Sequence, residues 1–126
     1  MTRAILLVDH GSRRPESNAQ LEEIARLVHA KGEPGLVVRC AHMELAPPTI
    51  AEGFAACVEA GASFVVVHPY MLAPGRHAIE DIPRMVAEAA KAFPSVRFAV
   101  SAPLGVHAGL ADAVLDRCRD ATYDDD

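Results

Sequence analysis

Four short apolar runs, each followed by a stretch with helical spacing, constrain the fold of this chain most strongly. The runs are rich in β-branched residues and lie at residues 4–8, 36–38, 64–67 and 96–100. The first and third are apolar throughout, as strands covered on both faces of a parallel sheet require. We therefore predict an α/β fold with a four-stranded parallel sheet, helices on both faces and right-handed crossovers.

Apolar residues recur at helical spacing after each run. The four sets are Leu21, Ile24 and Val28; Ile50, Phe54 and Cys57; Ile79, Ile82, Val86, Ala89 and Phe93; and Leu110, Val114 and Cys118. Two pairs have the spacing of capping boxes that open the first two helices: Ser17 with Gln20, and Thr49 with Glu52. Pro83 predicts that the regular part of the third helix begins near Asp81.

The length and composition of the chain fit one domain. It has 126 residues, of which 51% are hydrophobic. We expect a domain over residues 1–120 and a disordered acidic tip over residues 121–126. No apolar stretch reaches the roughly 18 residues of a membrane span, and we expect no signal peptide. Three cysteines without a close pair favour a reducing, cytoplasmic setting.

Charge and motifs exclude two common classes of function. The net charge of −5 is offset by no run of Lys and Arg interleaved with aromatic residues, so we expect no nucleic-acid partner. Neither phosphate-cradling glycine motif occurs, so nucleotide binding has little support and we expect no organic cofactor. The six histidines point instead to metal binding or proton transfer.

Five of the six histidines are predicted to lie at one edge of the sheet. In open α/β sheets, ligands bind beyond the carboxyl ends of the strands. The histidines that follow these ends, or lie in the loops that leave them, are His10, His42, His68, His77 and His107. His29 instead falls near the end of the first helix, the ordinary place for a surface histidine.

His10 has a context that suggests chemistry. Gly11 permits a sharp exit from the first strand. Ser12, Arg13 and Arg14 follow, and they bring anion-binding groups beside an imidazole. The ordinary alternative is a loop histidine whose ring is hydrogen-bonded to backbone.

His77 and Glu44 complete a candidate ligand set. His77 ends a Pro-Gly-Arg turn at the same edge, and Glu44 supplies the nearest carboxylate. Two imidazoles and a carboxylate suit Co, Ni, Fe or Zn better than Mg or Ca. Position alone leaves Glu44 open to a second interpretation, a solvent-facing loop acid. His42 and His68 rank lower, as partly buried side chains with hydrogen-bond partners.

Four segments carry a further signal. They are LLVDHGSR at 6–13, ELAPPTI at 44–50, PYMLAPGRH at 69–77 followed by EDIP at 80–83, and PLGVH at 103–107. In order and spacing they resemble the short, single-domain sirohydrochlorin chelatases of the cobalamin, siroheme and nickel-tetrapyrrole routes. The third segment is the most specific. Asp9 departs from the family pattern, in which a small residue is common at this position.

The resemblance implies a chelatase-like topology, which is flavodoxin-like. It also implies that the protein inserts a divalent metal into sirohydrochlorin. Co²⁺ is the first candidate for this metal, and Fe²⁺ and Ni²⁺ are alternatives. It implies that His10 and His77 are metal ligands and catalytic residues, with the third catalytic residue, Glu44, near them. It also implies a homodimer whose two copies correspond to the halves of longer chelatases.

Sirohydrochlorin carries many carboxylates, so an acidic protein needs local groups to bind it. We expect this of Ser12, Arg13, Arg14 and Arg76, with Arg84 nearby. Two other functions stay open. One is phosphoryl transfer with His10 as nucleophile. The other is a non-enzymatic cobalt or nickel carrier.

Overall fold

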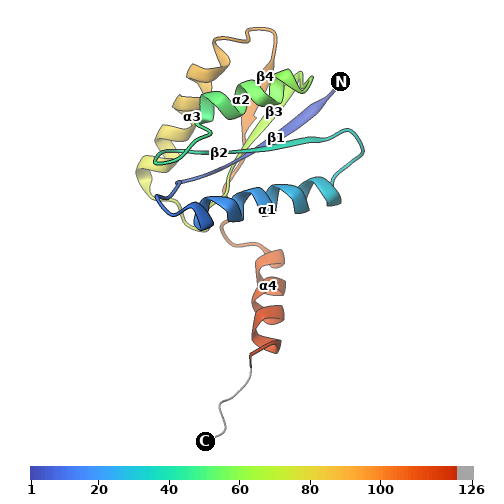
Figure 1. Cartoon of the computed structure of the whole chain (residues 1–126), viewed down its shortest axis with the longest axis vertical. Coiled ribbons are helices and arrows are strands. Elements are labelled where there is room, and N and C mark those ends of the chain that lie inside the picture. The colour runs from blue at the N-terminus through green and yellow to red at the C-terminus, as the bar shows by residue number, and fades with distance from the viewer. Residues whose placement is uncertain (122–126) are drawn as a thin grey trace, which may run out of the picture.

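The computed structural model describes residues 1–121, so the tip expected at residues 121–126 lies, apart from Ala121, outside the described part. Four parallel strands form one sheet in the order β2-β1-β3-β4 (Figure 1). The strands are β1 Arg3–Asp9, β2 Val37–His42, β3 Phe64–Pro69 and β4 Arg97–Val100. The helices are α1 Pro15–Lys31, α2 Ile50–Glu59, α3 Arg76–Ala90 and α4 Ala108–Arg119. The predicted α/β class is confirmed, and the strand order is that of flavodoxin-like folds.

The two faces of the sheet are covered unequally. On one face α2 and α3 enclose the main core, in which Leu6, Val65 and Phe54 are fully buried. On the other face α1 packs over β1 and β2, where Leu7 contacts a smaller cluster around Leu21. Helices on both faces are thus confirmed. However, α4 extends away from the body and none of its residues is buried (Figure 1).

The start of α3 differs from the prediction. The helix begins at Arg76 rather than near Asp81, and Pro83 lies in its interior. An interior proline costs roughly 3 kcal/mol. Burial of Ile82 and Val86 against the sheet offsets this, because each contributes about 1.5–3 kcal/mol. His77 therefore lies in the first helical turn instead of in a preceding loop.

One of the two predicted capping boxes is wrong. α1 begins at Pro15, whose ring fixes φ in the helical range, and it has no side-chain cap from Ser17. The box at α2 is confirmed: the Glu52 N–H donates to Thr49 Oγ1 at 3.1 Å, and the Thr49 N–H donates to Glu52 Oε1 at 2.8 Å. Within residues 1–121 no helix has the length and apolar character needed to cross a membrane.

Candidate functional site

The five histidines predicted for the carboxyl edge of the sheet are found there. His10 directly follows β1, His42 ends β2, and His68 is the penultimate residue of β3. His77 lies in the first turn of α3, and His107 is the N-cap of α4. The strand-end rule is therefore confirmed for all five, although β2 and β3 run further than predicted and include two of them.

Two of these histidines are held by neighbouring side chains. His42 is 2% exposed, and its Nδ1 lies 2.5 Å from Asp9 Oδ1. Asp9 therefore contacts His42 through its carboxylate. His68 Nδ1 lies 2.8 Å from Ser101 Oγ. Burial lowers the pKa of His68 below its usual value, partly opposed by a hydrogen bond to backbone, so this ring favours the neutral form.

A third histidine has a local structural role. His107 Nδ1 accepts a 2.8 Å hydrogen bond from the Gly109 N–H and so caps the first turn of α4. By contrast, His10 and His77 are exposed, and within residues 1–121 neither ring has a hydrogen-bond partner. Of the five edge histidines, these two keep both ring nitrogens available for a metal or a proton.

The loops after β1 and β2 are joined through their backbones. The Glu44 N–H donates to the His10 carbonyl at 3.1 Å, and the Met43 N–H donates to the Asp9 carbonyl at 2.8 Å. Gly11 has φ +89°, and a Cβ at this position would lie 1.9 Å from the Glu44 carbonyl oxygen. Only glycine fits this approach. The joint brings two of the predicted catalytic residues together, with the Glu44 side chain exposed.

The part of the chain that the structure describes contains no group of three His, Cys, Asp or Glu side chains placed to hold a metal ion. His10 follows β1 and His77 lies in the first turn of α3, so the two candidate ligands come from different elements. Such an arrangement differs from the closed four-ligand cage of a structural metal site. An ion held by two imidazoles keeps positions for water and can be handed on.

The candidate anion-binding residues differ in availability. Arg14, Arg76 and Arg84 each form an exposed ion pair with an acidic residue two to four positions away, at 3.1, 3.1 and 2.7 Å. Ser12 Oγ accepts a 3.0 Å hydrogen bond from the Arg14 N–H, which occupies the hydroxyl in the turn. Arg13 is exposed and forms no ion pair within the described residues. It is therefore the most accessible cation beside His10.

The sequence analysis missed a set of exposed apolar side chains at this edge. The loop residues are Leu45 (56% exposed), Leu72 (62%) and Val106, and α3 adds Ile79 (59%). Leu45 also has φ +72°, which is unusual for a residue with a side chain. Exposed apolar groups that gather beside polar ligands mark a binding surface. The sequence does contain an indication of this surface, because Leu45, Leu72 and Val106 lie outside the periodic apolar runs that predict buried residues.

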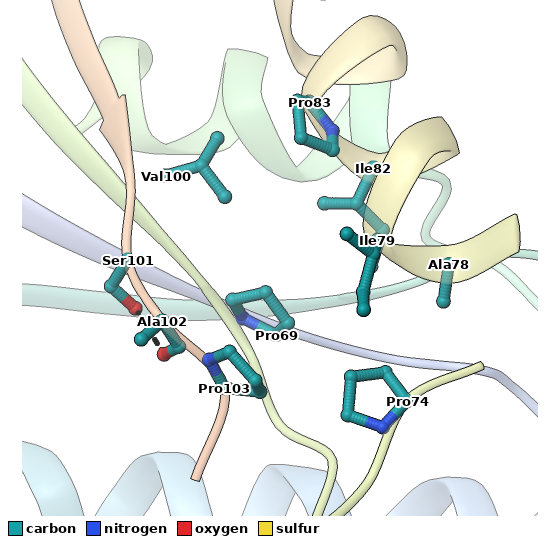
Figure 2. A pocket seen from close by; sticks show the side chains of 10 residues that line it. All are labelled: Pro69, Pro74, Ala78, Ile79, Ile82, Pro83, Val100, Ser101, Ala102 and Pro103. Atoms are coloured by element: carbon teal, nitrogen blue, oxygen red, sulfur yellow. Dashed lines mark hydrogen bonds between the residues drawn. The ribbon is translucent and has the colours of Figure 1, made fainter. Parts of the chain in front are cut away.

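An apolar cavity of about 300 Å³ opens beside this surface. It lies between the first turns of α3 and the ends of β3 and β4, as Figure 2 shows. Its lining residues are Pro69, Pro74, Ala78, Ile79, Ile82, Pro83, Val100, Ser101, Ala102 and Pro103. The prolines give rigid walls, and His77 adjoins the cavity through Ala78 on the same helical turn.

Comparisons with known proteins agree with this arrangement. Sirohydrochlorin ferrochelatase, chloroplastic, of Arabidopsis thaliana is 51% identical over 114 residues, which are 90% of this chain and 50% of that protein. Sirohydrochlorin cobaltochelatase of Methanococcoides burtonii is 33% identical over 125 residues, which cover 90% of this chain and 92% of that one. A solved structure, SirB from Bacillus subtilis with Fe³⁺, has a TM-score of 0.82 at 33% identity, over 98% of this chain and 50% of that one.

The chain spans about half the length of the first relatives it matches, although the cobaltochelatase of Methanococcoides burtonii has nearly its own length. A family model described as CbiX matches residues 4–121, nearly the whole of the described part. The chain belongs to the CbiX family.

Proposed function

We propose that this protein inserts a divalent metal, cobalt or iron, into sirohydrochlorin, with nickel as a further candidate. The observation that carries the proposal is the exposure of His10 and His77 at one edge, while the other three edge histidines are engaged by Asp9, Ser101 and Gly109. The names of the relatives support both the reaction and the choice of cobalt and iron.

Metal insertion exchanges one divalent cation for the two protons of the pyrrole N–H groups. Neutral imidazoles suit both halves of this exchange, because they bind first-row metals and accept protons near neutral pH. In the proposed mechanism, His10 and His77 hold the incoming metal as substrate and take up the released protons. The third group that can accept a proton is the carboxylate of Glu44. The backbone N–H of this residue donates a hydrogen bond to the His10 carbonyl, which keeps the two residues together.

The tetrapyrrole needs a flat apolar surface and local positive charge. The exposed side chains of Leu45, Leu72, Ile79 and Val106 supply the first. The net charge of −5 opposes approach of a polycarboxylate, so local cations must compensate. We assign this role first to Arg13, and then to Arg14 and Arg76, which must exchange an acidic neighbour for the substrate.

A single copy offers one wall of a cleft. The relatives twice its length have room for two such walls in one chain. We propose that two copies of this chain form a homodimer and supply the two walls, because a macrocycle buried on both faces needs both.

The reaction can be tested by mixing the protein anaerobically with sirohydrochlorin and each metal in turn, and following the absorbance of the macrocycle. His10→Ala and His77→Ala should lower turnover by about 10²-fold or more, because each removes a ligand and a base. The matched control is His29→Ala, since His29 is an exposed histidine in the last turn of α1. Full activity in both edge variants would contradict the assignment.

A further inference from the structure

Asp9 and His42 form a side-chain pair that the proposed reaction does not use. They are register partners at the last pair of β1 and β2, on the face that carries α1. Their side chains are 24% and 3% exposed, and His42 Nδ1 lies 2.5 Å from Asp9 Oδ1. Because a carboxylate only accepts hydrogen bonds, the ring N–H of His42 is the donor. Apolar residues in their place would stabilise a core as well, so the pair points to a role other than stability.

The pair contributes the shortest hydrogen bond in the joint between the loops after β1 and β2. The bond between His42 and Asp9 is 2.5 Å long, whereas the backbone bonds donated by Met43 and Glu44 are 2.8 and 3.1 Å long. A hydrogen bond to a charged acceptor is roughly twice as strong as one between neutral groups. Within residues 1–121 no buried side-chain nitrogen or oxygen lacks a partner. Loss of the Asp9 carboxylate would therefore leave the ring N–H of His42 unpaired.

His42 also supports the turn that carries His10. A Cβ added at Gly11 would lie 3.0 Å from the His42 Cβ, so the turn packs directly on this histidine. His42 is itself fixed in the loop after β2, because its backbone N–H donates to the Pro48 carbonyl at 2.8 Å. The pair with Asp9 therefore fixes the chain immediately before His10 and beneath the turn that follows it.

The chain is fixed again just after His10. The Asn18 side chain of α1 accepts from the Ser12 N–H at 2.9 Å and donates to the Ser12 carbonyl at 2.7 Å. His10 and Gly11 thus lie between two fixed points, Asp9 and Ser12. The His10 ring has no hydrogen-bond partner of its own in the part of the chain that the structure describes. Loss of the Asp9 contact would leave this short segment held by a side chain at one end only.

We propose that Asp9 and His42 are positioning residues for the metal site. Asp9 precedes His10, and the Glu44 N–H donates to the His10 carbonyl, so the pair acts on both residues through their backbone. Neither member of the pair contacts the metal or the tetrapyrrole. The inference rests on the proposed function, in which His10 binds the incoming metal. Removal of a group that orients a metal ligand typically weakens metal binding by about 10–100-fold, although the group is not itself a ligand.

Titration with Co²⁺ in the absence of tetrapyrrole measures the effect directly. Asp9→Ala should weaken Co²⁺ binding by about 10-fold or more, and it should shift the visible absorption of the bound ion, which reports ligand geometry. Asp9→Asn keeps an oxygen that can accept from His42 and should recover most of the lost affinity. In turnover, Asp9→Ala should raise the KM for Co²⁺ and leave the KM for sirohydrochlorin within about twofold of the parent value.

Two further variants separate positioning from stability. Gly35→Ala, in the loop before β2 at the opposite edge of the sheet, lowers stability through its backbone alone and should bind Co²⁺ as tightly as the parent. Asp9→Ala combined with His42→Phe leaves no unpaired ring N–H, so its urea midpoint should recover toward that of the parent while its weak Co²⁺ binding persists. Co²⁺ affinity that follows the urea midpoint across all these variants would overturn the proposal, because the pair would then be structural only.

His10→Ala in the same titration distinguishes failure of this inference from failure of the proposed function. Weak Co²⁺ binding in both His10→Ala and Asp9→Ala is the expected result, with circular dichroism to check that each variant is folded. If only His10→Ala binds weakly, the pair does not position His10, and the proposed function stands without it. If His10→Ala binds Co²⁺ as tightly as the parent, His10 is not a ligand, and both the proposed function and the inference are wrong.

Discussion

Replacement of Gly11 by alanine tests the joint between the first two loops. Two costs should add in this variant. The first is the left-handed backbone at φ +89°, which costs a residue with a Cβ roughly 1–2 kcal/mol. The second is the approach of the Glu44 carbonyl oxygen, which would lie 1.9 Å from the new Cβ and must retreat to the 3.4 Å of ordinary contact.

That retreat acts on the hydrogen bonds that hold the joint. The Glu44 N–H to His10 carbonyl bond is 3.1 Å long, and the Met43 N–H to Asp9 carbonyl bond is 2.8 Å long. Loss of each costs about 0.5–1.5 kcal/mol. Gly11→Ala should therefore lower the free energy of unfolding by about 2–5 kcal/mol in total.

Gly35 provides the control. Its φ is +87°, but a Cβ there would meet nothing within 4 Å. Gly35→Ala should therefore show the backbone cost alone, about 1–2 kcal/mol. Urea unfolding of both variants, analysed at a common m-value, measures the difference. Equal losses in the two variants would show that the joint yields without cost, and the account of Gly11 as a close-approach glycine would then be wrong.

Three further changes have defined outcomes. Thr49→Ala removes the cap of α2 and should cost about 1 kcal/mol in urea unfolding; an unchanged midpoint would show that the helix start is held elsewhere. His68 has a lowered pKa when folded, so the unfolded chain binds more protons as pH falls below about 6.5, and stability should drop there. His68→Gln should flatten this dependence between pH 7.5 and 5.5, and an identical pH profile would contradict it. Arg13→Ala should weaken sirohydrochlorin binding, measured by fluorescence quenching, more than Arg76→Ala, because Glu80 already neutralises Arg76; the reverse order would refute that reasoning.

Periodicity predicted the elements well because the buried faces dominate local structure. All four strands and four helices lie where the apolar runs and helical spacings placed them. The boundaries were less predictable where tertiary packing opposed a local preference. Pro83 favours a later start for α3, but burial of Ile82 keeps the helix continuous from Arg76. Local rules give the cost of such a proline, while the compensating burial depends on the sheet beneath it.

The position of α4 relative to the sheet could not be predicted from the sequence. Its spacing of Leu110, Val114 and Cys118 predicts an amphipathic helix, and the helix is present. Periodicity states which side of a helix must be covered, but not by which surface or by which copy. The predicted helices on both faces of the sheet are present as α1, α2 and α3, whereas none of the residues of α4 is buried.

The histidines show what separates a structural residue from an available one. Asp9 and His42 are register partners at the last pair of β1 and β2, so their side chains project to the same face and meet at 2.5 Å. His10 comes one residue later, where strand pairing has ended. A histidine within the ladder acquires a cross-strand partner and becomes buried, whereas one just beyond it stays exposed. Prediction of the strand ends to within one residue therefore decides which imidazole is buried and which stays exposed.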